Sequence, residues 1–153
     1  MMSIFDVYRE EQITVAQQTI YQMTDSFMLP SEEKWQSREG NVRSEIRFAH
    51  QWQGVFLLEC TQPFAVSLAS LMLSMDRSDL SNSDLTDVMG EVLNTIAGNL
   101  KCLLPADTEL SIPITTILPR KTPSTQPEPC KEHSEIVLES ELGQLKLSLM
   151  HCN

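Results

Sequence analysis

The strongest periodic pattern in the chain lies between Ser83 and Pro105. At about 100° per residue, its large apolar side chains fall on one side of a helix, as they do when a helix packs on a core. These apolar positions are Leu85, Val88, Met89, Val92, Ile96, Leu100 and Leu103. The sequence therefore predicts one long amphipathic helix here, with Ser83 as its N-cap.

The opposite side of this helix carries a polar row made of Asp87, Glu91, Asn94 and Gly98. Glu91 and Asn94 are three residues apart and are therefore neighbours on the helix surface. A helix face that only meets water commonly carries Glu–Lys pairs, and Gly98 removes a side chain where a partner's backbone could come close. The row indicates a binding surface. The alternative is a solvated helix face with an incidental asparagine.

The remaining patterns before this helix predict one more long helix, two strands and a second helix. The first helix runs from about Asp6 to Met28 and is ended by Pro30. Strands are predicted at Val42–His50 and Gln53–Thr61, and the continuous apolar run of the second is typical of a central strand. The next helix begins near Pro63. Expected core positions in the two helices are Ile13, Ala16, Ile20, Met23 and Phe27, and Phe64, Leu68, Leu71, Met72 and Met75.

After the motif helix, Thr108–Leu118 reads as a strand that contains Pro113, which predicts an edge, a bulge or a strand start there. Residues 119–133 are rich in proline and lack apolar periodicity, so a flexible loop is expected. Ser134–Ser140 and Gln144–His151 are predicted as the last strands. This order predicts a single α+β domain over residues 1–153, in which long helices pack on one face of a mainly antiparallel sheet. It also permits a structural pseudo-repeat.

Composition narrows the classes of partner. The formal net charge is −10, and no basic patch exceeds two adjacent residues, so neither nucleic acid nor an anionic membrane surface is expected as a partner. No apolar run is long enough to span a bilayer and no signal peptide is visible. The four cysteines are widely spaced, which fits reduced thiols in a cytoplasmic protein. Cys130 and His133 have a ligand-like spacing, but no paired C-x-x-C motif supports a metal site.

The segment GEVLNTIAGN, Gly90–Asn99, resembles the E-x-x-N helix of the CheC/CheX/FliY chemotaxis phosphatases. The order of elements, the Ala/Ser/Met-rich helix before the motif and the strand LSIPITTIL after it are also similar to CheX. Two-site members of the family carry a second E-x-x-N copy on the first helix. Here Glu10 is followed three residues later by Ile13, and Glu11 by Thr14, so the pattern resembles the single-site CheX type more than CheC.

The resemblance implies a phosphatase that acts on the phosphorylated aspartate of a CheY-like response regulator. Asn94 would orient the attacking water and Glu91 would meet a lysine of the receiver domain. The magnesium ion would belong to the partner, so no cofactor of the chain's own is expected. A homodimer that pairs through the sheets is also implied.

Three further residues of the helix are expected near the partner or in packing. Asp87 would contact a basic rim of the receiver, or would favour the helix N-terminus through the dipole. Gly98 would serve close approach, and Gly90 would serve either partner approach or close helix packing. Asn99 lies at the edge of the apolar stripe and is expected to be a buried hydrogen-bonding residue.

Two other functions remain open at this point. One is a non-catalytic receiver-binding or flagellar-switch interaction module that uses the same helix face. The other is a structural α+β domain with no link to phosphate. Replacing Asn94 separates the first from a catalyst, because a protein that only binds does not need the carboxamide to position water.

Overall fold

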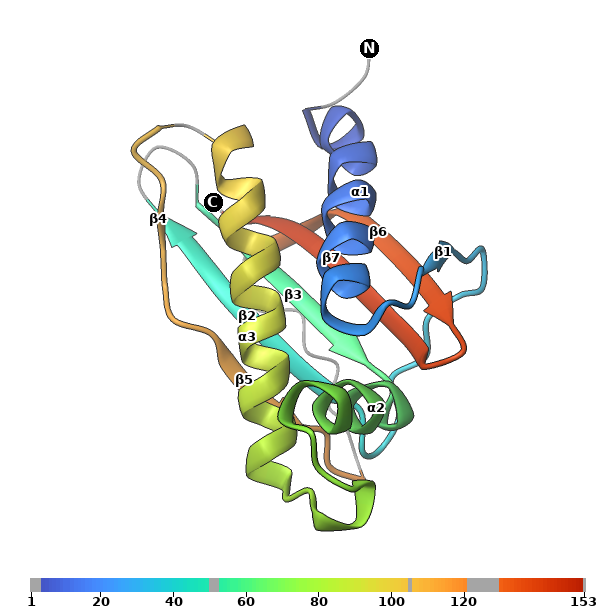
Figure 1. Ribbon diagram of the computed structural model, residues 1–153. Helices are drawn as coiled ribbons and strands as arrows, with labels where there is room; N and C mark the ends of the chain where they lie inside the picture. The colour runs from blue at the N-terminus through green and yellow to red at the C-terminus, as the bar shows by residue number, and fades with distance from the viewer. Residues whose placement is uncertain (1–3, 50–52, 105, 121–129, 153) are drawn as a thin grey trace.

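Three α-helices cover one face of an antiparallel sheet in the part of the chain that the structure describes (Figure 1). This computed structural model describes residues 4–49, 53–104, 106–120 and 130–152, with the backbone alone for 4–8 and 130–133. The helices are α1 (Ile4–Thr24), α2 (Gln62–Leu73) and α3 (Asn82–Leu100), with the 3₁₀ turns η1 (Arg77–Asp79) and η2 (Lys101–Leu103). The strands are β1 (Leu29–Pro30), β2 (Val42–Ala49), β3 (Gly54–Cys60), β4 (Glu109–Leu110), β5 (Ile114–Ile117), β6 (Cys130–Ser140) and β7 (Gly143–Cys152). The predicted fold class is confirmed.

The sheet is arranged as two similar halves. Its order is β1-β6-β7-β3-β2, with β4 and β5 both paired to the outer edge of β2. The hairpins β2–β3 and β6–β7 meet where β3 pairs antiparallel with β7. In Figure 1, α3 lies over β2 and α1 lies over β6, and short strands flank both hairpins. The structure thus has the pseudo-repeat that the order of elements permits.

The core lies between the helices and the sheet. Along β2, Val42, Ser44, Ile46 and Phe48 are buried toward the helices, and the residues between them point to the other face. Every residue of β3 is buried, which confirms that it is a central strand. No helix among the described residues is long and apolar enough to cross a membrane.

The predicted cores of α1 and α2 extend too far toward their C-termini. Phe27 is 54% exposed because α1 ends at Thr24 and Asp25 turns the chain with a φ of 57°. On α2, Leu71 is 51% exposed, while the small residues Ala65 and Ala69 are buried. Periodicity identifies the apolar side of a helix, but it does not show where along the helix the neighbouring elements end.

Two strand predictions need correction. The segment around Pro113 is not one strand, because β4 ends at Leu110 and β5 begins at Ile114, directly after the proline. The expected irregularity at Pro113 is therefore confirmed. The strand β6 begins at Cys130, four residues before the predicted start, so the last part of the expected loop is strand. Residues 121–129 of that loop lie outside the described residues.

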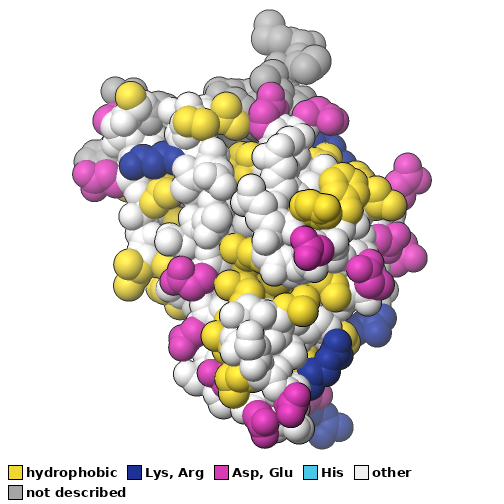
Figure 2. Space-filling model, in the orientation of Figure 1, with side chains coloured by type: hydrophobic (Ala, Val, Ile, Leu, Met, Phe, Trp, Pro, Cys, Tyr) yellow, Lys and Arg dark blue, Asp and Glu magenta, His cyan; other side chains and the backbone are white. Residues whose placement is uncertain are grey.

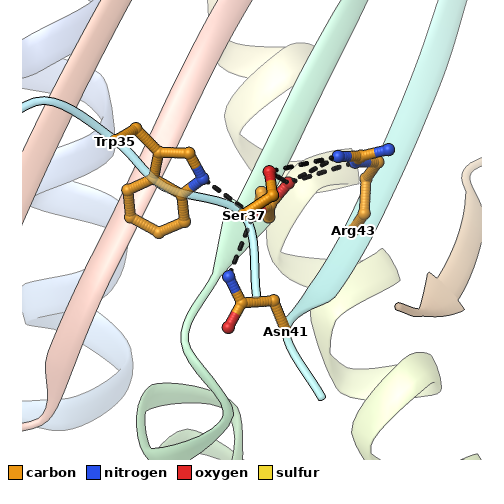
Figure 3. A network of polar contacts seen from close by, with 5 residues as sticks. Trp35, Ser37, Asn41 and Arg43 are labelled. Carbon is orange, nitrogen blue, oxygen red and sulfur yellow. Dashed lines mark hydrogen bonds and ion pairs between the residues drawn. The ribbon is translucent and has the colours of Figure 1, made fainter. Parts of the chain in front are cut away.

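A buried carboxylate fixes the segment before β2 to the face of the sheet away from the helices. Glu59 of β3 is fully buried and accepts hydrogen bonds from Trp35 Nε1 at 2.7 Å and Asn41 Nδ2 at 2.9 Å. Ser37 Oγ donates at 3.0 Å, and Arg43 forms an ion pair at 2.8 Å (Figure 3). Burial by itself raises the pKa of Glu59, but the hydrogen bonds from Asn41, Arg43 and Trp35 outweigh it and hold that pKa below its usual value.

Candidate functional site

The helix α3 begins with a reciprocal cap. The backbone N–H of Ser81 donates to Asp84 Oδ2 at 2.9 Å, and the backbone N–H of Asp84 donates to Ser81 Oγ at 3.1 Å. The N-cap is therefore Ser81 and not the predicted Ser83. The helix is long and this cap fixes its first turn, so its exposed face has a fixed orientation.

The phase of α3 matches the sequence pattern. The six predicted core residues that lie within the helix, from Leu85 to Leu100, are buried, and Leu93 and Ala97 are buried with them. Leu103 lies in η2 and is only partly buried. Asp87, Glu91, Asn94 and Gly98 are all exposed. Asn99 is exposed too, which corrects the expectation that it is buried, because the side of α3 that carries it is not covered.

Glu91 and Asn94 present free side chains. Among the described residues, no hydrogen bond or ion pair involves the carboxylate of Glu91 or the carboxamide of Asn94; the bond from Thr95 Oγ1 reaches the backbone oxygen of Glu91. Both side chains lie on one exposed row, one helical turn apart. Their hydrogen-bonding groups are therefore available to a partner.

The two glycines of the motif have different surroundings. A Cβ on Gly90 would lie 3.2 Å from Thr115 Oγ1 and 3.6 Å from Pro113 Cγ, so its missing side chain lets α3 pack closely on β5. A Cβ on Gly98 would meet nothing within 4 Å. Packing within the chain therefore explains Gly90, whereas Gly98 leaves open space beside Asn94, where a partner's backbone can approach.

A groove lies between α3 and β5, next to Glu91. It is lined by Thr86, Asp87, Gly90, Glu91, Pro113 and Thr115, and its volume is about 450 Å³. None of these lining residues is basic, and two are carboxylates, so the groove favours a cation. Figure 2 shows acidic side chains along the exposed side of α3. Asp84 lies in the first turn of α3, while Asp87 lies one turn further along and faces the groove.

Sequence reasoning identified the helix side of this groove but missed its strand side. Thr115 is held by a 2.8 Å hydrogen bond between its hydroxyl and that of Ser44 on β2. Pro113 was recognised as a strand irregularity, yet no local pattern links it to Gly90, which precedes it by more than twenty residues. Only the pairing of β5 with β2 brings these residues under α3.

The described residues offer no metal centre: no group of three or more His, Cys, Asp and Glu side chains among them could hold an ion. The side chains of Cys130 and His133 lie outside the described residues. Cys60 is a buried free thiol and Cys102 an exposed one, whereas Cys152 is disulfide-bonded, which corrects the expectation of reduced thiols at that residue.

The sequence matches the family model of the chemotaxis phosphatase CheX over residues 42–127, which is more than half of the chain. The fold is similar to that of chemotaxis protein CheX from Vibrio vulnificus, with a TM-score of 0.77, 18% identity and coverage of 94% of this chain and 95% of that chain. The fold is also similar to that of a CheC-like superfamily protein from Shewanella sp. PV-4, with a TM-score of 0.78, 16% identity and coverage of 99% of both chains. No curated protein matches the sequence.

A third similar structure is the CheX–CheY–BeF₃–Mg²⁺ complex from Borrelia burgdorferi. Its TM-score is 0.69 at 16% identity, with 94% of this chain and 96% of that chain covered. At these identities the structural likeness shows a shared fold.

Proposed function

Because the chain belongs to the CheX family of chemotaxis phosphatases, we propose that it removes the phosphoryl group from the aspartyl phosphate of a CheY-like receiver domain. The observation that carries the proposal is the pair Glu91 and Asn94, one turn apart on a capped and well-packed helix. Both side chains are exposed, and neither has a hydrogen-bond or ion-pair partner in the part of the chain that the structure describes. The solved complex of a CheX from Borrelia burgdorferi with CheY, BeF₃ and Mg²⁺ supports the choice of partner.

Hydrolysis of the aspartyl phosphate requires little covalent chemistry from this chain. A water attacks phosphorus in line with the bond to the aspartate oxygen, that bond breaks, and inorganic phosphate and a free carboxylate result. Asn94 suits the task of holding the water, because a carboxamide both donates and accepts hydrogen bonds without adding charge near the phosphoryl oxygens. A magnesium ion on the receiver supplies charge neutralisation at the phosphoryl group.

Glu91 acts in docking. Its free carboxylate accepts a charge-assisted hydrogen bond from a lysine of the receiver and so fixes the register of α3 against the receiver. Since Asn94 lies one turn beyond Glu91, this register sets where the carboxamide meets the water. Gly98, one turn further, leaves room for the receiver's backbone.

A homodimer and a cytoplasmic location belong to the same proposal. The outer edge of β6 pairs with β1 at Leu138 and Glu139, and the Ser31 N–H donates to the Val137 carbonyl at 2.8 Å. Further along this edge, Arg9 Nη1 donates to the Glu135 carbonyl. The part of this edge before Glu135, toward the start of β6 at Cys130, is where a second copy of the sheet would pair. Sedimentation velocity tests this part: a single monomeric species at all concentrations would contradict it.

The experiment that tests the proposal follows loss of phosphate from a CheY-like receiver of the same organism, with wild type, Glu91→Ala and Asn94→Ala. Wild type should accelerate the loss. Asn94→Ala should still bind but not accelerate it, and Glu91→Ala should weaken binding. Binding without acceleration by wild type would favour an interaction module on the same face. Neither binding nor acceleration with any receiver of that organism would contradict the proposed function.

A further inference from the structure

The exposed row of α3 lacks an apolar anchor. Asp87, Glu91, Asn94 and Gly98 offer charge, an amide and open space, but no large hydrophobic side chain. Protein interfaces usually cover about 800 Å² on each partner and draw most of their affinity from a few buried anchors. Asp87 and Asn94 are only about 10 Å apart along the helix axis. A receiver seated on this row therefore also covers the neighbouring elements.

The most exposed large hydrophobic residue in the described part of the chain lies on one of those elements. Ile112 is 81% exposed and directly precedes Pro113, which lines the groove beside Glu91. Its position is fixed by a local distortion of the sheet edge. Leu110 pairs with Phe48 and Ile114 pairs with Glu45, so four steps along this edge oppose three steps along β2. The extra residue makes a β-bulge at Ile112–Pro113.

The bulge is held in place by hydrogen bonds to β2 and by packing against α3. The backbone N–H of Ser111 donates to the Arg47 carbonyl at 2.8 Å, and the Arg47 N–H donates to Ser111 Oγ at 2.9 Å. Pro113 is held from the other side, since it packs at Gly90 of α3. Ile112 thus lies in a segment that is held on both sides. A partner that covers it does not have to order a flexible loop on binding.

The two isoleucines of this edge have different surroundings. Ser111 lies opposite Arg47, whose side chain points away from the helices, whereas Pro113, directly after Ile112, contacts α3 at Gly90. Ile114 pairs with Glu45 and shares its face, away from α3. Figure 2, which views the helix side, shows hydrophobic side chains at this edge of the sheet next to the acidic side chains of α3.

We propose that Ile112 and the acidic groove between α3 and β5 form a second docking contact for the receiver, next to the Glu91–Asn94 pair. The matching surface on the receiver carries an apolar side chain that covers Ile112 and a lysine or arginine that enters the groove toward Asp87. This inference rests on the proposed function and names how the receiver is selected. The charge of the groove favours that occupant, because Asp87 and Glu91 line it and none of the described residues that line it is basic.

Another exposed apolar group lies at the end of α2, where Leu71 is 51% and Met72 37% exposed. Neither residue lines the groove that contains Glu91. The side of α3 that faces β5 is therefore the better candidate for the second contact, and the same experiment compares the two sides.

The test measures binding of the receiver loaded with BeF₃⁻ and Mg²⁺, together with the rate of phosphate loss as the receiver concentration is varied. The variant is Ile112→Ser, and the matched controls are Ile114→Ser and Leu71→Ser. Ile114 is 59% exposed at the start of β5 and shares the face of Glu45, away from α3. Ile112→Ser should weaken binding and raise KM about 10-fold, equivalent to about 1.4 kcal/mol, and the rate at saturation should stay within about two-fold. Both controls should stay within about two-fold of wild type in binding.

The charge of the groove is tested separately. Asp87→Asn should weaken binding about 3-fold at low salt and reduce the loss of affinity when salt is added. Equal affinities of Ile112→Ser, Ile114→Ser and wild type, with wild type still active and Asn94→Ala inactive, would overturn the second contact while leaving the phosphatase standing. A larger effect of Leu71→Ser than of Ile112→Ser would also overturn it. If wild type binds no receiver, both proposals fail together.

Discussion

Replacing Glu59 by glutamine should lower the free energy of unfolding by roughly 3 kcal/mol. Trp35 and Asn41 donate to one carboxylate oxygen, while Ser37 and Arg43 donate to the other. A glutamine amide has only one acceptor oxygen, so its NH₂ group must face one of these two pairs of donors. Each lost bond to a charged acceptor costs about 1.5 kcal/mol or more when its donor stays buried.

The difference between the two proteins should depend on pH with a defined sign. The pKa of Glu59 is lower in the folded protein than its usual value, so in acid the unfolded chain binds the proton more readily. Stability from this residue is therefore fully present above the unfolded pKa of about 4.3 and is lost as the pH falls through the folded pKa. The advantage of wild type over Glu59→Gln should shrink in that acid range.

Urea denaturation followed by circular dichroism at pH 7, and then at steps down to pH 3.5, measures both effects. Glu135→Gln is the matched control, because Glu135 is an exposed carboxylate on a strand of the same sheet; it should change stability by less than about 0.5 kcal/mol. A Glu59→Gln protein within 1 kcal/mol of wild type at pH 7, or a difference that does not change with pH, would refute this reasoning.

Three further predictions concern α3 and the thiols. Ser81→Ala removes the cap and should cost about 1 kcal/mol, lowering the melting temperature by roughly 2–4 °C; an unchanged melting curve would contradict the cap. Gly98→Ala should raise the free energy of unfolding by about 0.8–1 kcal/mol, because its Cβ meets open space. The same change should slow dephosphorylation if the receiver comes close at this position. A stabilised protein with an unchanged rate of dephosphorylation would show that Gly98 is not part of the interface. A thiol reagent should modify Cys102 in the folded protein, while Cys60 should react only on unfolding, because burial raises the pKa of its thiol; peptide mass spectrometry would show the reverse order if this is wrong.

The sequence was most informative for features that depend on a single helix or strand. The phase of α3 follows from the 3.6-residue period, so the exposed row and the buried stripe could both be predicted. The irregularity at Pro113 could be predicted as well, because proline lacks the N–H that a sheet ladder needs.

Features that depend on contacts between distant segments could not be predicted in this way. Glu59 lies within a buried strand, and nothing near it in sequence shows that Trp35 and Arg43 surround its carboxylate. In the same way, the sequence left two roles open for Gly90, partner approach and close packing. Only the fold brings Pro113 and Thr115 next to it. Phe27 has the right spacing for a core position, but the helix ends before reaching it.

The central claim is that Asn94 positions the water that hydrolyses the aspartyl phosphate. It is tested most directly by the single-turnover rate of phosphate loss at saturating CheY-like receiver, for Asn94→Ala and for Asn99→Ala, an exposed asparagine elsewhere on the same helix. We expect the rate to fall on the order of 10²-fold for Asn94→Ala, and to stay within about two-fold of wild type for Asn99→Ala. An Asn94→Ala protein that binds the receiver and still turns it over at the wild-type rate would contradict the account.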